Sequence, residues 1–106
     1  MKRGAFRNSE RSLQAAIVKA FNLLGFLVIH IPNQYSYGRV RDAGLVSGAP
    51  DLIVLKDGKV FFLEVKTKTG RMRPSQKLFA ERLRQHGFDY FVVRSLDQAL
   101  KAVGYG

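Results

Sequence analysis

Four consecutive apolar residues, Val-Phe-Phe-Leu at positions 60–63, most constrain what this chain can fold into. Successive side chains of a strand point to opposite faces, so a strand through this segment is apolar on both faces. Such a strand belongs at the centre of a sheet that is covered on both sides. The segment therefore predicts a small α/β sandwich built on a mixed sheet.

The remaining elements follow from periodicity and turn residues. Asp57-Gly58 is typical of a two-residue hairpin turn, which predicts antiparallel strands over 51–55 and 59–68. Further strands are expected at 26–31 and 90–93, and helices from about Ser9 to Leu24, from Pro74 to His86, and after Ser95. The order is α-β-β-β-α-β-α. Residues 1–8 are expected to form a basic, poorly ordered arm, residues 9–106 a single domain, and residues 32–50 a long loop.

Composition limits the classes of function. The 106 residues suit one domain, and no apolar run is long enough to span a bilayer, so no membrane partner is expected. The absence of cysteine excludes disulfides, thiolate zinc sites and cysteine nucleophiles. The net charge of +10, from 18 basic and 8 acidic residues, favours a polyanionic partner, most commonly nucleic acid. A basic protein without such a partner remains the alternative.

Two charged residues interrupt the apolar strand at its end. Glu64 and Lys66 are two apart, so they share one face of the strand. Counting outward from the turn, Asp51 lies opposite Glu64 in the hairpin, within a few ångströms. Two facing carboxylates repel each other unless a divalent cation lies between them, and hard cations such as Mg²⁺ take oxygen ligands. The two histidines, His30 and His86, are not placed near an acid at ligand spacing, so zinc is not expected.

Three further polar residues fall on inward stripes of the two longer helices. Glu10 and Gln14 share the stripe of Leu13 and Ile17, and Gln76 shares that of Phe79. Glu10 is either a third carboxylate of the site or a charge placed favourably near the positive end of a helix. Gln76 either hydrogen-bonds a phosphate, a water molecule or Lys66, or caps a neighbouring loop.

Basic and aromatic residues flank these positions in two loops. The candidate DNA contacts are Lys68, Arg71, Arg73 and Lys77 after the third strand, and Tyr35, Tyr37, Arg39 and Arg41 in the long loop. Lysine and arginine neutralise phosphates, and aromatic rings stack on bases. A solvated basic face is the alternative interpretation.

Pro50-Asp51, followed after a hairpin by Glu64-Val65-Lys66, resembles the Pro-Asp…(Asp/Glu)-x-Lys motif of the restriction-endonuclease-like nucleases. Together with the helix carrying Glu10 and Gln14, the segment 48–51 and Ser75-Gln76, the chain resembles the VRR-Nuc family in its stand-alone phage and bacterial form. The resemblance covers residues 9–93 and implies a restriction-endonuclease-like α-β-β-β-α-β core with a small mixed sheet flanked by helices.

The resemblance also implies roles for these residues. Asp51, Glu64 and the Val65 carbonyl would hold Mg²⁺ or Mn²⁺, with Glu10 assisting. Lys66 would orient or activate the attacking water. Gln76 would support the lysine or the water, and Gln14 would support the site. The implied activity is metal-dependent endonuclease cleavage of DNA, selective for branched substrates such as four-way junctions, by a homodimer acting in DNA repair. The implied location is the cytoplasm of a bacterial cell or a phage-infected host.

Two rival functions remain at this stage. A non-catalytic nucleic-acid-binding domain would use the basic loops and keep Glu64 and Lys66 as a structural ion pair, although an ion pair needs no second carboxylate opposite it. A sequence-specific restriction enzyme would need added recognition elements, for which 106 residues leave little room.

Overall fold

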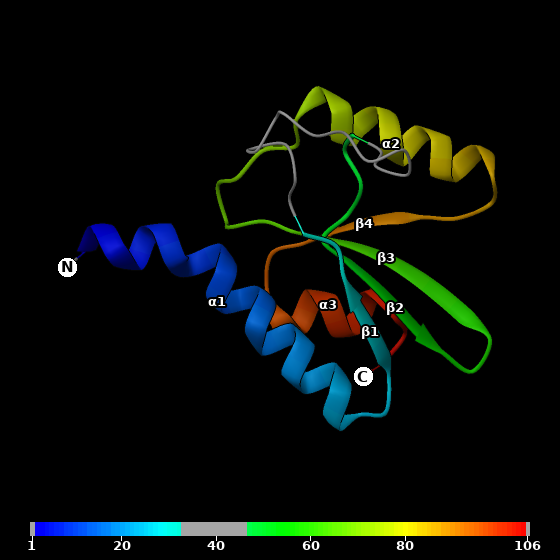
Figure 1. Cartoon of the computed structure of the whole chain (residues 1–106), viewed down its shortest axis with the longest axis horizontal. Coiled ribbons are helices and arrows are strands. Elements are labelled where there is room, and N and C mark those ends of the chain that lie inside the picture. Colours follow the sequence, from blue (N-terminus) through cyan, green and yellow to red (C-terminus); the bar gives the residue numbers. More distant parts are fainter. Residues whose placement is uncertain (1, 33–46, 106) are drawn as a thin grey trace.

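A computed structural model describes residues 2–32 and 47–105 of the chain, with side chains from residue 9 onward. The elements are α1 (Lys2–Leu23), β1 (Leu27–His30), β2 (Leu52–Lys56), β3 (Lys59–Val65), α2 (Pro74–Gln85), β4 (Tyr90–Val93) and α3 (Leu96–Ala102). This order confirms the predicted α-β-β-β-α-β core with a final short helix (Figure 1).

The four strands form one mixed sheet in the order β1-β2-β3-β4. Strands β1, β2 and β3 pair antiparallel, and β4 pairs parallel with β3. The turn between β2 and β3 has positive φ at both Asp57 (52°) and Gly58 (79°), as a two-residue hairpin of this kind requires. Strand β3, which contains the apolar run, therefore lies inside the sheet with a neighbour on each side.

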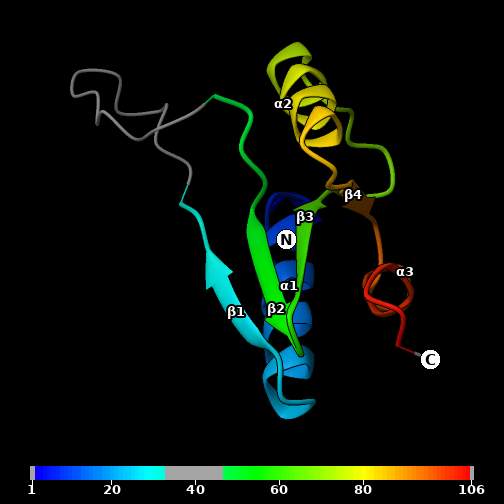
Figure 2. The same ribbon diagram turned by 90° about the vertical axis from the view of Figure 1, so that its right-hand side faces the viewer.

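Helices α1 and α3 pack together on one face of the sheet and enclose the core (Figures 1 and 2). Ile17 and Phe21 of α1 are fully buried there. The rest of this core comes from Phe26, from alternate residues of the sheet and from α3: Leu52, Val54, Leu63, Val65, Val93, Ala99 and Val103. Tyr90 of β4 points to the opposite face, where its ring lies 6.1 Å from that of Phe79 of α2. Helix α2 therefore covers the second face beside β4.

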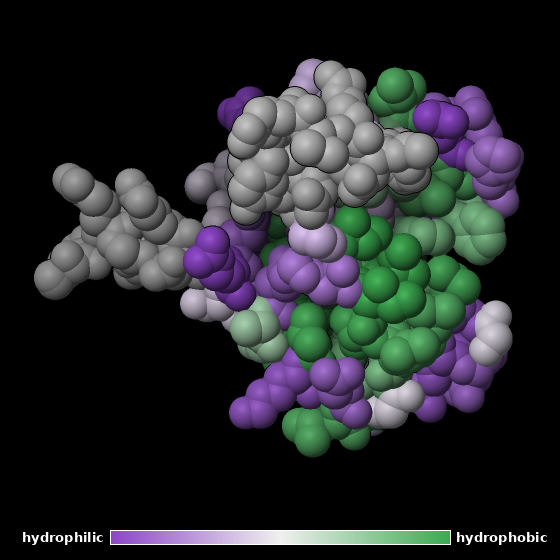
Figure 3. Space-filling model, in the orientation of Figure 1, coloured by the Kyte–Doolittle hydropathy of each residue, from purple (hydrophilic) through white to green (hydrophobic). Residues whose placement is uncertain are grey.

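The second face of the sheet is covered less completely than the apolar run predicted. The register places six apolar residues on it: Leu27, Ile29, Ile53, Leu55, Val60 and Phe62. Leu27 is 62% exposed and Ile29 44%, and the other four are half-buried. Phe62 packs edge-to-face against Phe88, just after α2, with 5.7 Å between the ring centroids. We call these six residues the open apolar face. The strand region is correspondingly apolar at the surface in Figure 3.

Several element boundaries differ from the expectation. Helix α1 begins at Lys2 rather than near Ser9, because no proline or capping turn interrupts the sequence between them, so residues 2–8 are helical. That residues 1–8 form a poorly ordered arm in solution stays a prediction. Strand β3 ends at Val65 rather than Lys68, where the chain leaves the ladder for a loop. Most of the long loop, residues 33–46, lies outside the described residues. No described helix is long and apolar enough to cross a membrane.

We predict that Phe21→Ala lowers the free energy of unfolding by about 3–5 kcal/mol, because it removes a fully buried ring and leaves a cavity. Leu23→Ala, on the same helix but 80% exposed, is the control and should change it by about 0.5 kcal/mol or less. Urea unfolding measures both. Equal effects of the two substitutions would contradict the packing of α1 on the sheet.

Candidate active site

The hairpin brings Asp51 and Glu64 together at one end of the sheet. Leu52 pairs with Leu63, so the next step of the same register sets Asp51 opposite Glu64. The Asp51 carbonyl accepts a hydrogen bond of 2.8 Å from Ile31 N–H, which holds the backbone of Asp51 in place. Its side chain turns toward β3, where Oδ2 accepts a hydrogen bond of 2.8 Å from Val65 N–H. The predicted juxtaposition of the two acids is thus present.

Glu64 is buried and contacts polar groups at both carboxylate oxygens. Its Oε2 accepts a 2.8 Å hydrogen bond from the Gln76 amide, and the Lys66 ammonium lies 3.7 Å from the same oxygen. Its Oε1 lies 3.2 Å from the Tyr90 hydroxyl. Lys66 and Gln76 are also buried. A carboxylate that faces another acid is therefore surrounded by a cation and two hydrogen-bond donors.

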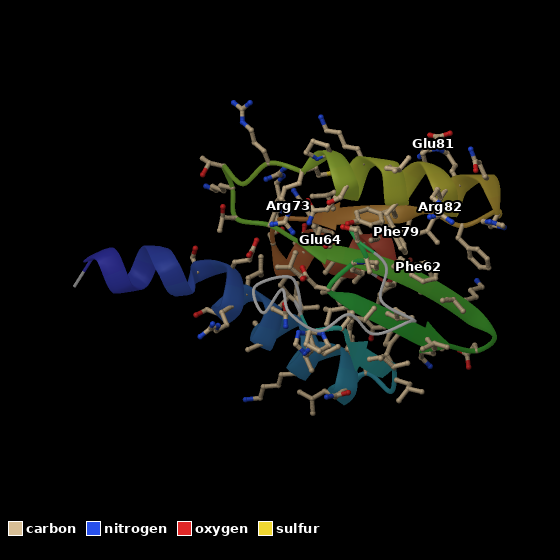
Figure 4. All side chains as sticks on the ribbon, turned by 45° about the horizontal axis from the view of Figure 1, so that its top comes forward. Phe62, Glu64, Arg73, Phe79, Glu81 and Arg82 are labelled. Atoms are coloured by element: carbon tan, nitrogen blue, oxygen red, sulfur yellow. The ribbon has the colours of Figure 1, made fainter. Side chains whose placement is uncertain are left out.

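Gln76 links this carboxylate to the start of α2. Its amide nitrogen donates to Glu64, and its Oε1 accepts a 2.8 Å hydrogen bond from Arg73 N–H, just before the helix begins. The side chain is 2% exposed, so both ends of the amide are satisfied inside the protein. Figure 4 shows Glu64 near Arg73 at this end of α2, with Glu81 and Arg82 toward the other end. Gln76 thus caps the backbone at the start of α2, which is one of the two roles expected from its position in the sequence, and it also bonds Glu64.

Gly48 allows the segment before Asp51 to lie against α2. A β-carbon at this position would stand 2.1 Å from the carbonyl oxygen of Ser75, and φ is +83°. Only glycine fits both requirements. The Gly48 carbonyl also lies 3.2 Å from the Tyr90 hydroxyl, the same hydroxyl that reaches Glu64. Tyr90 therefore connects β4, the segment before Asp51 and the buried carboxylate.

Burial, and for Glu64 and Glu10 also the charge of Asp51, shift the acids toward their protonated forms. Burial first, and then the charge of Asp51, raise the pKa of Glu64 to about 7 from an ordinary 4.5, against the lowering effect of Lys66. Burial also raises the pKa of Asp51, opposed by the Val65 N–H bond. The pKa of Glu10 is raised by partial burial and then by the charge of Asp51, although Lys66 and Arg73 oppose the shift. Burial, together with Glu64, raises the pKa of Tyr90.

The donor set suits a hard divalent cation. Asp51 and Glu64 offer carboxylate oxygens from adjacent strands, and Mg²⁺ or Mn²⁺ usually takes one or two protein carboxylates and completes its shell with other oxygens. Glu10 acts on Asp51 and Glu64 electrostatically. Among the described residues, however, no three acidic or histidine side chains converge as a ready metal-binding group. His30 lies close enough to Asp51 to lower its pKa slightly, a proximity that the sequence did not indicate.

The other predicted site residues fall into three groups. The loop after β3 and the first turn of α2 expose Lys68, Arg71, Arg73 and Lys77. The charge of Arg73 acts on Glu10. Gln14 lines a shallow groove with His30 and has no hydrogen bond to the site among the described residues. Tyr35, Tyr37, Arg39 and Arg41 lie outside the described residues. Sequence reasoning missed Tyr90 and the close approach at Gly48; the signal available for Tyr90 was one hydroxyl in an otherwise apolar strand.

We predict that raising the pH from about 5 to about 8, in EDTA, lowers the thermal unfolding midpoint of the wild-type protein more than it lowers that of Glu64→Gln. An acid with a higher pKa in the folded chain binds its proton preferentially there, so its contribution to stability is fully present below its unfolded pKa of about 4.5 and is lost as pH rises toward 7. Glutamine does not titrate, so the midpoint of Glu64→Gln should depend less on pH over this range. Parallel pH profiles would contradict the shifted pKa.

Comparisons with known proteins agree on one family. The sequence model of the VRR-NUC domain matches residues 8–97. A solved structure described as a VRR-NUC domain is 35% identical, with a TM-score of 0.68 over 89% of this chain and 92% of that chain. A second, described as a VRR-NUC domain protein, has a TM-score of 0.71 over 89% of this chain and 84% of that chain; at 22% identity it shows a shared fold. The comparison with curated proteins gave no match.

The family match extends over most of the chain and includes every residue of the cluster built by Asp51, Glu64, Lys66, Gln76 and Tyr90. Each of the two structural matches covers 89% of the chain. The chain therefore belongs to the VRR-NUC family of nuclease domains.

Proposed function

We propose that this chain is a metal-dependent DNA endonuclease that hydrolyses phosphodiester bonds in branched DNA such as four-way junctions. The observation that carries the proposal is the buried Glu64, which faces Asp51 across the hairpin with Lys66 beside it. A DNA repair role in the cytoplasm of a bacterial cell or a phage-infected host fits this activity and belongs to the same proposal.

The charges of the site argue for a bound cation. Three of the chain's eight acidic residues, Glu10, Asp51 and Glu64, act on one another electrostatically, while Lys66 is the buried cation among them. A phosphate would be repelled from such a site, although the protein as a whole carries a net charge of +10. Asp51 and Glu64, with the Val65 carbonyl and Glu10 as further candidates, would hold Mg²⁺ or Mn²⁺. When bound, such an ion polarises the phosphate and lowers the pKa of coordinated water.

Lys66 supplies a fixed positive charge inside the site. Its ammonium lies 3.7 Å from Glu64, and its backbone N–H donates to the Val93 carbonyl over 3.1 Å, so the ladder holds the main chain of this residue in place. A preorganised cation stabilises the negative charge that develops on a phosphate under attack. Gln76 and Tyr90 hold the Glu64 carboxylate and so orient the group that Lys66 contacts.

The DNA backbone would run over the basic loop and the start of α2. The exposed basic residues there are Lys68, Arg71, Arg73 and Lys77, and the charge of Arg73 acts on Glu10 of the carboxylate cluster. Contacts of this kind bind phosphates without reading bases, which favours recognition of DNA shape over sequence. Candidates for binding one arm of a branched DNA are Tyr35, Tyr37, Arg39 and Arg41.

We expect Asp51→Asn and Lys66→Ala each to lower the rate of junction cleavage by about 10²-fold or more while leaving binding detectable, because each removes a charge from the reacting centre. Matched controls make the same chemical changes at exposed positions of the same hairpin: Asp57→Asn and Lys59→Ala. Cleavage of labelled four-way junction, flap, linear duplex and single strand is measured with Mg²⁺, with Mn²⁺ and with EDTA.

Each outcome of this experiment separates the candidate functions. Cutting of branched DNA that requires metal and is lost only in the two site variants supports the proposal. Equal binding by all five proteins, with no cutting under any metal, would identify a non-catalytic binding domain. Cutting that follows base sequence rather than branching would point to a restriction-type enzyme.

We also propose that two copies pair through the open apolar face. A protein of net charge +10 repels a second copy over most of its surface, whereas these six residues carry no charge. Contiguous exposed apolar surface commonly marks a protein interface. A symmetric pair would present two copies of the site to a branched substrate, one for each strand to be cut.

Ile29→Glu is predicted to shift the protein from dimer to monomer, because it places a carboxylate in the open apolar face. The control is Leu78→Glu, which makes the same change on exposed α2, where Leu78 is 62% exposed. Analytical ultracentrifugation in metal-free buffer measures the mass. If the wild-type protein is a monomer, or if Leu78→Glu dissociates it as well, this assignment of the interface is wrong.

A further inference from the structure

The guanidinium of Arg94 holds the loop that follows β3. Its Nη1 lies 2.6 Å from the Thr67 carbonyl oxygen and 2.7 Å from that of Gly70, and a longer contact of 3.3 Å reaches the Lys68 carbonyl. Three backbone acceptors from one short segment therefore converge on a single nitrogen. Within the part of the chain that the structure describes, no carboxylate pairs with Arg94.

The sheet places Arg94 where it can reach this loop. Val65 and Val93 are partners in the parallel pairing of β3 with β4, so the residues that follow them, Lys66 and Arg94, leave the sheet side by side. The backbone of Arg94 is held in turn, because its N–H donates to the Gln98 side chain over 2.7 Å. Gln98 N–H donates to the Ser95 hydroxyl at the start of α3 over 3.0 Å. Arg94 thus connects the anchored C-terminal helix to the loop.

The loop has few bonds of its own that would fix its shape. Between Lys66 and Arg73 the described hydrogen bonds within the loop are those from Gly70 N–H to the carbonyl and hydroxyl of Thr67, at 3.2 and 3.0 Å. Backbone carbonyls that point the same way repel one another, and a cation facing them removes that repulsion. Hydrogen bonds from a charged donor are stronger than neutral ones. Arg94 is therefore a charged restraint that acts on this loop from outside it.

We propose that Arg94 is a positioning residue that sets the path of loop 66–73, and with it the basic side chains that lie beside the carboxylate site. The loop begins at Lys66, carries Lys68, Arg71 and Arg73, and passes into α2 at the residue whose N–H bonds Gln76. Freeing the loop would leave the ladder-bound main chain of Lys66 in place but release the groups that align the DNA backbone. The effect on cleavage rests on the function proposed above; the effect on the loop does not.

Hydrogen exchange in metal-free protein tests the restraint by Arg94 independently of any cleavage activity. Arg94→Ala is expected to speed exchange of the Gly70 amide by about tenfold or more, while exchange in β2 and β3 stays unchanged. Arg94→Lys, which retains a charged donor but lacks the planar fork, should restore part of the protection. Arg84→Ala is the control, because it removes the same charge from an exposed position on α2. If Arg94→Ala destabilises the whole fold, Arg94→Gln is used instead of Arg94→Ala in both assays, because glutamine keeps part of the aliphatic side chain.

Single-turnover cleavage of a four-way junction at saturating protein tests the consequence. Arg94→Ala should lower the rate by about tenfold, because small misplacements of positioning groups are costly in rate, while junction affinity falls no more than in Arg84→Ala. Partial rescue by Arg94→Lys is expected. Equal Gly70 exchange in Arg94→Ala and Arg84→Ala would overturn the proposal, and so would equal cleavage rates. Absence of cleavage by the wild-type protein would instead overturn the proposed function, and the exchange result would then decide the role of Arg94.

Discussion

The carboxylate of Asp51 faces that of Glu64 across one hairpin, and the remainder of the site is arranged around this repulsion. Burial first, and then the charge of Asp51, raise the pKa of Glu64 to about 7. Lys66, Gln76 and Tyr90 offset part of the cost by placing a cation and two donors on Glu64. A divalent cation would offset the rest, because it favours both ionised carboxylates at once.

The same contacts explain why a small chain can hold such a site firmly. Glu64, in β3, receives partners from β4, from α2 and from Lys66 just after β3. The Val65 N–H of β3 fixes the Asp51 side chain. The core on the other face, formed with α1 and α3, holds these strands in register. Because Gly48 meets the backbone of Ser75 without room for a β-carbon, the segment leading to Asp51 is held against the helix that carries Gln76. The polar site and the apolar core therefore depend on the same two central strands.

Local patterns in the sequence predicted the parts of this arrangement that depend on short-range geometry. The Asp57-Gly58 turn set the register and so placed Asp51 opposite Glu64, and helical spacing placed Gln76 inward. Tyr90 escaped prediction because it meets Glu64 across 26 residues and Gly48 across 42, contacts that depend on the parallel pairing of β3 with β4. The close approach of Gly48 to Ser75 likewise joins segments far apart in the sequence. The three-carbonyl contact of Arg94 is hidden for the same reason. Apolar patterning indicated a strand that is apolar on both faces, but it did not specify what covers the second face of the sheet.

Metal binding measured by calorimetry tests the central claim most directly, since it addresses the paired carboxylates without depending on a substrate. Titration of Mn²⁺ into wild-type protein near pH 7, in two buffers of different ionisation enthalpy, should show binding with release of protons, because the raised pKa of Glu64 leaves that carboxyl partly protonated before the metal enters. Asp51→Asn should lose the binding, and Asp57→Asn should retain it. Absence of binding by the wild-type protein, or equal binding by Asp51→Asn, would contradict the account.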